Sequence, residues 1–114
     1  QSDSLEEKTS GAALKLIITP FGTNGLSFSV PATKNLSEMK FDGKVYADSG
    51  AGDAKGHSSS GKRVNDHLLE VEDQINGKPE YNEDLKVSDD GKTLTIVSRS
   101  ANSSAVFTEV WDKQ

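Results

Sequence analysis

The stretch LEVEDQINGKPEYNEDLKVSDDGKTLTIV, residues 69–97, decides the fold of this chain. In it, apolar and polar side chains alternate on both sides of Asn76-Gly77 and again on both sides of Asp90-Gly91. Such alternation is typical of a β-strand that has one face in a core and the other in water. Asn-Gly and Asp-Gly favour tight hairpin turns, because both residues adopt a positive φ at low steric cost. The stretch therefore predicts consecutive antiparallel hairpins.

The same pattern extends over most of the remaining chain. Asp42-Gly43 is a further hairpin signal, and the segment from Gly22 to Gly25 is another candidate turn. Further strand-like segments cover residues 13–19, 26–30, 36–41, 44–46, 59–64 and 105–112. We therefore expect an all-β fold, an antiparallel up-and-down meander of about eight strands that curls into a barrel. A two-sheet β-sandwich is the alternative, because the number of strands does not separate the two architectures.

The chain has the length of one domain with a single core, since it contains 114 residues. Residues 1–11 are polar and acidic, and we expect a flexible tail there. A short helical turn is the alternative, because Ser4 and Glu7 have the spacing of a capping box. Residues 12–114 then form a single β-barrel domain. Within it, residues 47–62 are rich in Gly, Ser, Ala and Asp, which predicts an exposed loop that leads into a polar strand.

Composition excludes several classes of protein. The net charge of −5 opposes binding to nucleic acid or to an anionic membrane, because both need a basic patch. No apolar run approaches the roughly 20 residues that cross a bilayer, so we expect no membrane insertion. There is no cysteine, and hence no disulfide. The chain opens at Gln1, which is consistent with a mature exported protein or with a trimmed sequence, and we take a secreted or periplasmic location as a hypothesis.

No catalytic, metal or nucleotide motif is recognisable, and we expect neither an enzyme nor a cofactor. His57 and His67 could share a metal with Asp66 or Asp53. Their spacing matches no fixed ligand pattern, however, and two exposed loop histidines explain them as well. Arg63 and Arg99, the only arginines, could hold a ligand carboxylate inside a barrel. The alternative places both arginines on the outer face, in water or paired with an acidic residue.

Several short segments give the chain a resemblance to a known group of proteins. They are Lys40-Phe41-Asp42-Gly43-Lys44, Lys62-Arg63-Val64-Asn65-Asp66, Leu69-Glu70-Val71, Val87-Ser88-Asp89-Asp90-Gly91-Lys92-Thr93-Leu94-Thr95 and Trp111-Asp112-Lys113-Gln114. Through them, residues 14–114 resemble functionally uncharacterised, secreted bacterial domains of lipocalin-like, or calycin, type. The resemblance implies a small β-barrel, and many calycins hold apolar molecules inside the barrel.

The chain also departs from the better-known calycins. Lipocalins carry a Gly-x-Trp motif in the first strand, and no such motif precedes Leu14. Fatty-acid-binding proteins end with an Arg-x-Tyr pair that holds the ligand carboxylate, whereas the equivalent spacing here reads Glu109-Val110-Trp111. A carboxylate at that position would repel the carboxylate of a fatty acid. The connection over residues 19–26 is also too short for their helical lid. The type of ligand therefore does not follow from the resemblance.

Two functions remain. In the first, which the resemblance favours, the barrel interior binds a small apolar molecule, with Trp111 near one mouth. The expected ligand-binding residues are Leu16, Phe28, Leu69, Val71, Leu85, Leu94, Ile96, Arg63, Arg99 and Trp111. In the second, these side chains fill the core, and the domain is a structural or protein-binding module. Such a module could form a homo-oligomer through an edge strand.

Overall fold

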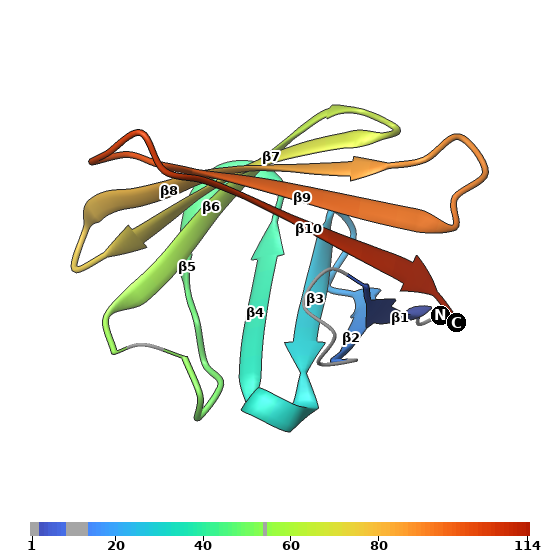
Figure 1. The fold of residues 1–114 in the computed structure, drawn as a ribbon. Helices are drawn as coiled ribbons and strands as arrows, with labels where there is room; N and C mark the ends of the chain where they lie inside the picture. The colour runs from blue at the N-terminus through green and yellow to red at the C-terminus, as the bar shows by residue number, and fades with distance from the viewer. Residues whose placement is uncertain (1–2, 9–13, 54) are drawn as a thin grey trace.

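A computed structural model describes residues 3–8, 14–53 and 55–114. These residues form ten β-strands and one short 3-10 helix (Figure 1). The elements are β1 (Asp3–Glu7), β2 (Lys15–Pro20), β3 (Gly25–Val30), η1 (Pro31–Thr33), β4 (Asn35–Lys40), β5 (Asp42–Ala47), β6 (His57–Asn65), β7 (Leu68–Ile75), β8 (Lys78–Val87), β9 (Thr93–Ser100) and β10 (Val106–Lys113).

All ten strands of the described residues belong to one antiparallel sheet, in the order β4-β3-β2-β1-β10-β9-β8-β7-β6-β5. Sequential strands are neighbours throughout, except that β4 and β5 form the two ends and β1 pairs with β10. The sheet curls into a nearly closed barrel, in which β7 to β10 cross over β2 to β4 (Figure 1). The predicted antiparallel meander and barrel are confirmed, and a single sheet of this kind is not a two-sheet sandwich.

The N-terminal segment differs from its prediction. Residues 3–7 form β1 rather than a tail or a helical turn, while residues 1, 2 and 9–11 lie outside the described residues. In β1, Leu5 lies opposite Leu16 of β2 and is buried in the core. Because β1 pairs along both of its edges, its backbone hydrogen bonds are satisfied by the neighbouring strands. Pairing along both edges, together with the burial of Leu5, therefore holds this otherwise polar segment in place.

Two of the predicted turns are present. Between β7 and β8, Asn76 and Gly77 have φ values of 53° and 79°, the two positive values that a type I′ turn requires. Between β2 and β3, the Phe21 N–H donates to the carbonyl of Gly25 at 3.0 Å, and Gly22 has a φ of 63°. Both turns join neighbouring antiparallel strands, as the alternation around them predicted.

Asp90-Gly91 lies in the predicted hairpin connection, within a loop longer than a two-residue turn, whereas Asp42-Gly43 forms no hairpin because β4 and β5 do not pair in the described residues. Residues 88–92 connect β8 to β9, and within them Gly91, with a φ of 73°, has a positive φ but Asp90 does not. The Ser88 hydroxyl donates to the Asp90 carboxylate at 2.6 Å, which stabilises this longer turn. Gly43, with a φ of 81°, lies where the register of β5 shifts against β6, so that Asp42-Gly43 forms an irregularity at the start of a strand.

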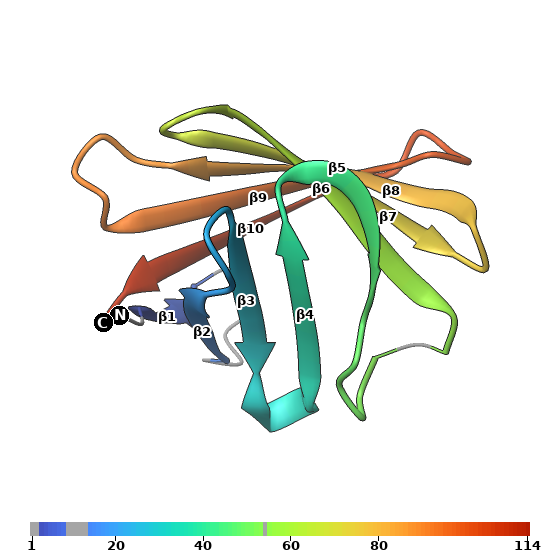
Figure 2. The ribbon, with the colours of Figure 1, turned by 180° about the vertical axis from the view of Figure 1, so that it is seen from behind.

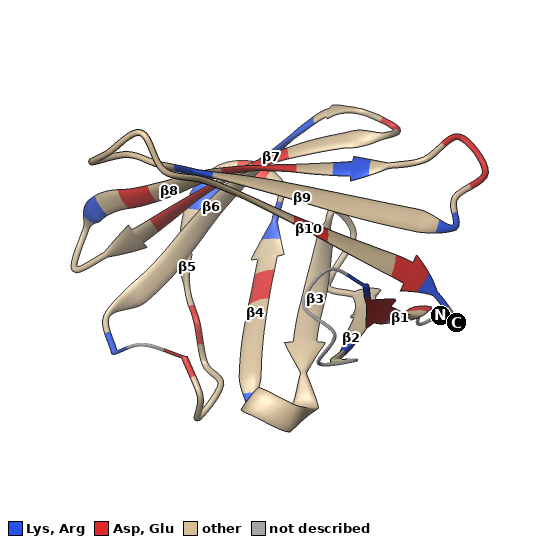
Figure 3. Ribbon diagram, in the orientation of Figure 1, with Lys and Arg blue, Asp and Glu red and all other residues tan. Residues whose placement is uncertain are grey.

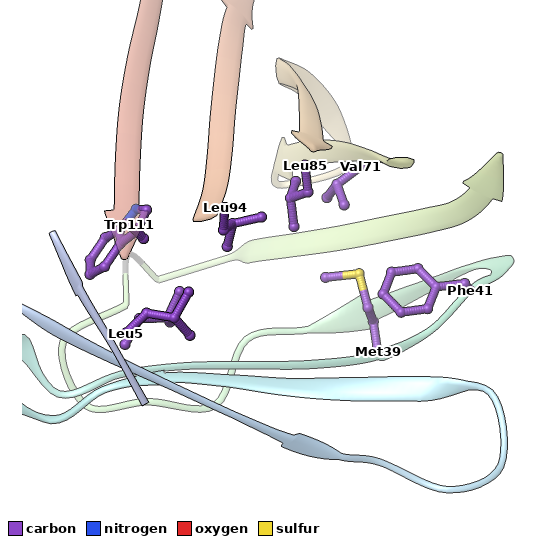
Figure 4. Packing of buried hydrophobic residues seen from close by; sticks show 8 residues of the cluster. Leu5, Met39, Phe41, Val71, Leu85, Leu94 and Trp111 are labelled. Carbon is purple, nitrogen blue, oxygen red and sulfur yellow. The ribbon is translucent and has the colours of Figure 1, made fainter. Parts of the chain in front are cut away.

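The core lies between the two crossing walls of the barrel (Figure 4). Val71 and Leu85 point from one wall toward Met39 and Phe41 on the other (Figure 4). Gly61 of β6 is buried beside them, and a Cβ atom there would lie 2.7 Å from the Phe41 ring, so the ring packs directly on the strand backbone. The buried apolar side chains of the described residues are Leu5, Leu16, Met39, Phe41, Val71, Leu85, Leu94 and Trp111.

A loop covers part of the gap between β4 and β5. Within the described chain these two strands do not pair, although they follow each other in sequence. The Ser49 and Gly52 N–H groups of the following loop donate to the carbonyls of Leu36 and Lys34, at 3.1 and 2.8 Å. Figure 2 shows the segment after β5 running beside β4. The loop predicted within residues 47–62 is thus confirmed over the described residues 48–53 and 55–56, and it lies against an edge strand.

Asp53 holds this loop to β4. Its Oδ2 accepts hydrogen bonds from the N–H groups of Leu36 at 2.9 Å and Gly50 at 2.8 Å. Its Oδ1 accepts a third hydrogen bond from Asn35 Nδ2 at 2.7 Å. One carboxylate therefore joins both sides of the gap and caps an edge N–H group that no strand pairs within the described residues.

We expect Asp53→Ala to destabilise the fold by about 2 kcal/mol, because hydrogen bonds to a charged group are lost and the Leu36 N–H is left without its partner. Urea denaturation measures the change in the free energy of unfolding, and amide hydrogen exchange at Leu36 should accelerate. Asp66→Ala, at the exposed turn between β6 and β7, is the matched control and should change stability little. Equal stability of the two variants would contradict this role of Asp53.

Candidate ligand cavity

A cavity of about 230 Å³ lies inside the barrel. Its apolar lining consists of Leu16, Phe28, Val30, Met39, Val71, Leu85, Ile96 and Trp111. Its polar lining consists of Ser37, Asp48, His57, Ser59, Asp73, Glu83 and Glu109. Figure 3 shows acidic segments on β7, β8 and β10, the strands that carry three of these carboxylates. The interior therefore combines an apolar floor with acidic walls.

Strand register explains why carboxylates face inward. Residues that lie directly opposite each other in an antiparallel pair have side chains on the same face of the sheet. Glu83 lies opposite the buried Val71, and Glu109 lies opposite Ile96. Asp73 is two residues beyond Val71 on β7, so it shares the inward face. The alternation that builds the apolar floor thus continues into acidic residues farther along the same strands.

Asp48 and His57 form an ion pair at the wall of the cavity. His57 Nδ1 contacts Asp48 Oδ2, and its Nε2 lies 4.0 Å from Glu80. Burial raises the pKa of Asp48, which its bonds to His57 and Ser37 only partly offset. Burial alone would lower the pKa of His57, but the hydrogen bond and charge of Asp48, with other carboxylates nearby, raise it above its usual value. The imidazole is therefore stabilised in its charged form.

Asp73 and Glu83 form a second pair. The Ser59 hydroxyl donates to Asp73 Oδ1 at 2.8 Å, and the Ser98 hydroxyl donates to Glu83 Oε2 at 3.0 Å. Burial, followed by the charge of Asp73 and the hydrogen bond between the two carboxyl groups, raises the pKa of Glu83 to about 9. Glu83 is therefore a neutral acid near pH 7, and its carboxyl O–H donates a hydrogen bond to Asp73.

Glu109 and Trp111 lie on the inner face of β10. Burial and the charge of Glu7 raise the pKa of Glu109, and the nearby Trp111 indole offsets this only in part. The side chain of Trp111 is 5% exposed. Trp111 therefore lies on the floor of the cavity, whereas the sequence analysis placed it near a mouth. Its buried Nε1–H makes no hydrogen bond of normal geometry to a described residue.

An open cleft adjoins the cavity along β8, β9 and β10. This cleft has a volume of about 670 Å³, shares Glu83 and Glu109 with the cavity and is also lined by Glu7. Tyr81 and Phe107 line it in an edge-to-face contact, with ring centroids 6.2 Å apart. Phe107 is 54% exposed. The cleft therefore places two aromatic rings close to Glu83 and Glu109, the two acidic residues that it shares with the cavity.

The structure separates the predicted ligand-binding residues into three groups. Leu16, Phe28, Val71, Leu85, Ile96 and Trp111 line the cavity. Leu94 and Leu69 belong to the packed core and are absent from its described lining. Arg63 and Arg99 are exposed side chains that the described lining does not include either, and Arg99 pairs with Asp84 at 3.0 Å. The prediction that an arginine side chain lines the barrel interior is therefore wrong for this cavity. The alternative of a surface ion pair is correct for Arg99.

Sequence reasoning missed the polar half of the lining. Asp73 has the same strand parity as Val71, and Glu83 the same parity as Leu85, so alternation contained a signal for both. Asp48 and His57 meet because they lie just beyond the paired residues Ala47 and Ser58 at the end of the β5–β6 ladder, a register that the sequence of this glycine- and serine-rich segment does not indicate. His67, by contrast, lies exposed at the far end of β6. The described His, Asp and Glu side chains contain no group of three that could hold a metal ion.

No protein-family model matches this chain, and a search of curated proteins found no significant match. A functional proposal therefore rests on the barrel, on its cavity and on the resemblance of short sequence segments to calycins. No helix within the described residues has the length and hydrophobicity needed to cross a membrane.

The raised pKa of Glu83 predicts a pH-dependent stability. Between its usual value of 4.5 and about 9, the folded protein binds more protons at this site than the unfolded chain. Stability should therefore fall as the pH rises through this window. Asp48, Glu109 and His57, whose pKa values are also raised, act in the same direction.

We expect Glu83→Gln to reduce this pH dependence, because the substitution removes the group with the largest shift while keeping a hydrogen-bonding side chain. Urea denaturation at about pH 5 and about pH 9 measures the difference in unfolding free energy. Glu70→Gln, at an exposed position of β7, is the control and should keep the wild-type pH dependence. A slope that Glu83→Gln leaves unchanged would show that Glu83 titrates normally.

Proposed function

We propose that this domain binds a small molecule with an apolar body inside the barrel and catalyses no reaction. The observation that carries the proposal is the cavity of about 230 Å³, which has an apolar floor and shares Glu83 and Glu109 with an open cleft. A cavity of about 150 Å³ in another protein holds benzene, so the space here suits a ligand of roughly ten non-hydrogen atoms. The resemblance to secreted lipocalin-like domains supports such a role, at an extracytoplasmic location.

The expected affinity is moderate. A ligand of this size that buries about 200 Å² of apolar surface gains about 5 kcal/mol, at about 25 cal/mol per Å². That free energy corresponds to a Kd in the submillimolar range, and well-placed polar contacts tighten it. Trp111 supplies one such contact, since its buried Nε1–H would gain an acceptor from a bound ligand.

A second candidate function is association with another chain, including a second copy of this one. β5 lies at one end of the sheet in the described residues, and its Val45 is 56% exposed. An edge strand with an exposed apolar residue can add a strand from a partner. Sedimentation analysis tests this alternative, and a monomer at high concentration would count against self-association.

We expect neutral aromatic molecules of about ten non-hydrogen atoms, such as indole, to bind the barrel. Trp111 is the single tryptophan, so its indole N–H gives one NMR signal that reports on the cavity floor. Titration with indole should shift this signal saturably. A solvent extract of the purified protein, examined by mass spectrometry, should contain any ligand that remains bound during purification.

Val30→Phe is the test of location, because its larger side chain projects from the lining of the cavity. We expect this variant to lose indole binding at least about tenfold while keeping the fold. Val64→Phe adds the same volume at a position of β6 that is 47% exposed, and it should bind as the wild type does. If the Trp111 signal does not respond to indole and the extract is empty, the filled-core alternative is correct.

A further inference from the structure

We propose that the molecule bound inside the barrel is a small organic cation, a primary ammonium group on a compact apolar body. This inference rests on the proposed function and specifies its ligand. We call the carboxylates of Asp48, Asp73, Glu83 and Glu109 the acidic wall. In the proposed complex, the ammonium group contacts the acidic wall and the apolar body lies on the floor formed around Trp111.

The charge of the lining favours a cation. Four carboxyl side chains line the cavity, and a fifth, Glu7, lines the adjoining cleft. The one basic side chain in the described lining is His57, which already pairs with Asp48. A ligand carboxylate would meet repulsion from this wall, whereas an ammonium group is attracted, and the low polarity of the floor strengthens both effects. The lining thus discriminates between ligands of equal size by their charge.

An unsatisfied acceptor points to a ligand independently of the total charge. The Asp48 side chain is 5% exposed, and its Oδ2 is used by His57. Its Oδ1 is buried and makes no hydrogen bond of normal geometry to a described residue, although the Ser37 hydroxyl interacts with the same carboxylate. A buried carboxylate oxygen without a donor is costly, and a ligand donor in the cavity would remove that cost. An ammonium group has three donors, so it can bond Asp48 and a second carboxylate together.

An unsatisfied donor lies on the floor. The buried Nε1–H of Trp111 makes no hydrogen bond of normal geometry to a described residue, although it interacts with the carboxyl group of Glu109, two residues away on the same face of β10. A hydroxyl group on the ligand body could accept from Trp111 and donate to Glu109. The lining therefore suits a molecule with an ammonium group at one end and a hydroxylated ring at the other. Tyramine has this chemistry and ten non-hydrogen atoms, so it is the probe of choice.

Binding of a cation should be coupled to release of a proton. Glu83 is held neutral by burial and by Asp73, and the charged or titratable groups around it are Asp73 on β7, Glu109 on β10, His57 on β6, Asp48 after β5 and Glu7 on β1. A positive charge at the wall stabilises the ionised form of Glu83 and lowers its pKa. Affinity for the cation should therefore rise with pH from about 6 to about 8, and deprotonation of His57 acts in the same direction.

The experiment compares three probes that share one ring and differ in the charge of the side chain. They are tyramine, which is cationic, tyrosol, which is neutral, and 4-hydroxyphenylacetate, which is anionic. Calorimetry with the full chain should give tyramine at least about tenfold tighter binding than tyrosol, and no detectable binding of the anion. Titrations in two buffers with different ionisation enthalpies should show a proton released with tyramine but not with tyrosol.

Matched variants locate the binding site. Asp48→Asn and Glu83→Gln should each weaken tyramine about tenfold and leave tyrosol nearly unchanged, because each removes a carboxylate of the acidic wall. Asp84→Asn is the control, since Asp84 is adjacent to Glu83 on β8 but pairs with Arg99 on the outer face. It should bind all probes as the wild type does.

The outcomes separate this inference from the proposed function. If tyrosol binds as tightly as tyramine, the inference that the ligand is a cation is wrong, while the proposed small-molecule binding remains correct. Tyramine binding that neither Asp48→Asn nor Glu83→Gln weakens would place the amine outside the acidic wall and also overturn the inference. If indole binds and none of the three probes does, the inference fails alone. If neither indole nor any probe binds, both proposals fail together.

Discussion

The pairing of β1 with β10 is the interaction on which the architecture depends. It places the first described strand between β2 and the last strand, with Glu7 opposite Trp111. Without this pairing the sheet would divide into β4-β3-β2-β1 and β10-β9-β8-β7-β6-β5. The cavity draws its lining from both of these parts, so it exists only because a short polar strand joins them. Backbone hydrogen bonding, more than apolar burial, supplies this connection.

The interior is built from two chemically different halves along the same strands. The apolar half provides the core that stabilises the fold, while the acidic half opposes it, because burying carboxyl groups without full compensation is unfavourable. Ser59 and Ser98 donate to two of these carboxyl groups and reduce the cost. A barrel selected for stability alone would have apolar residues in these positions. Departures of this kind from the rules of core formation tend to coincide with functional sites.

Local sequence patterns predicted the meander, the barrel and the apolar floor, because alternation and the Asn76-Gly77 turn are short-range signals. They failed where long-range contacts decide the structure. β1 has one large apolar residue, Leu5, and forms because strands distant in sequence pair with both of its edges. The Asp48–His57 pair likewise depends on how the β5–β6 pairing continues past Ala47 and Ser58, where the Asp48 N–H donates to the His57 carbonyl. Strand parity predicts that Asp73 faces inward with Val71, but the sequence-based lining was chosen mainly from apolar residues and therefore left Asp73 out.

The two ends of the described chain lie side by side (Figure 1). The Gln114 N–H donates to the carbonyl of Ser4 at 2.8 Å, and Leu5 is paired with Lys113. A short peptide could therefore join them, and new ends could be made at the exposed Asn76-Gly77 turn, giving a circularly permuted barrel. The same geometry would let an attachment through either end hold the barrel on a surface in nearly the same orientation, because both ends leave the barrel at one place.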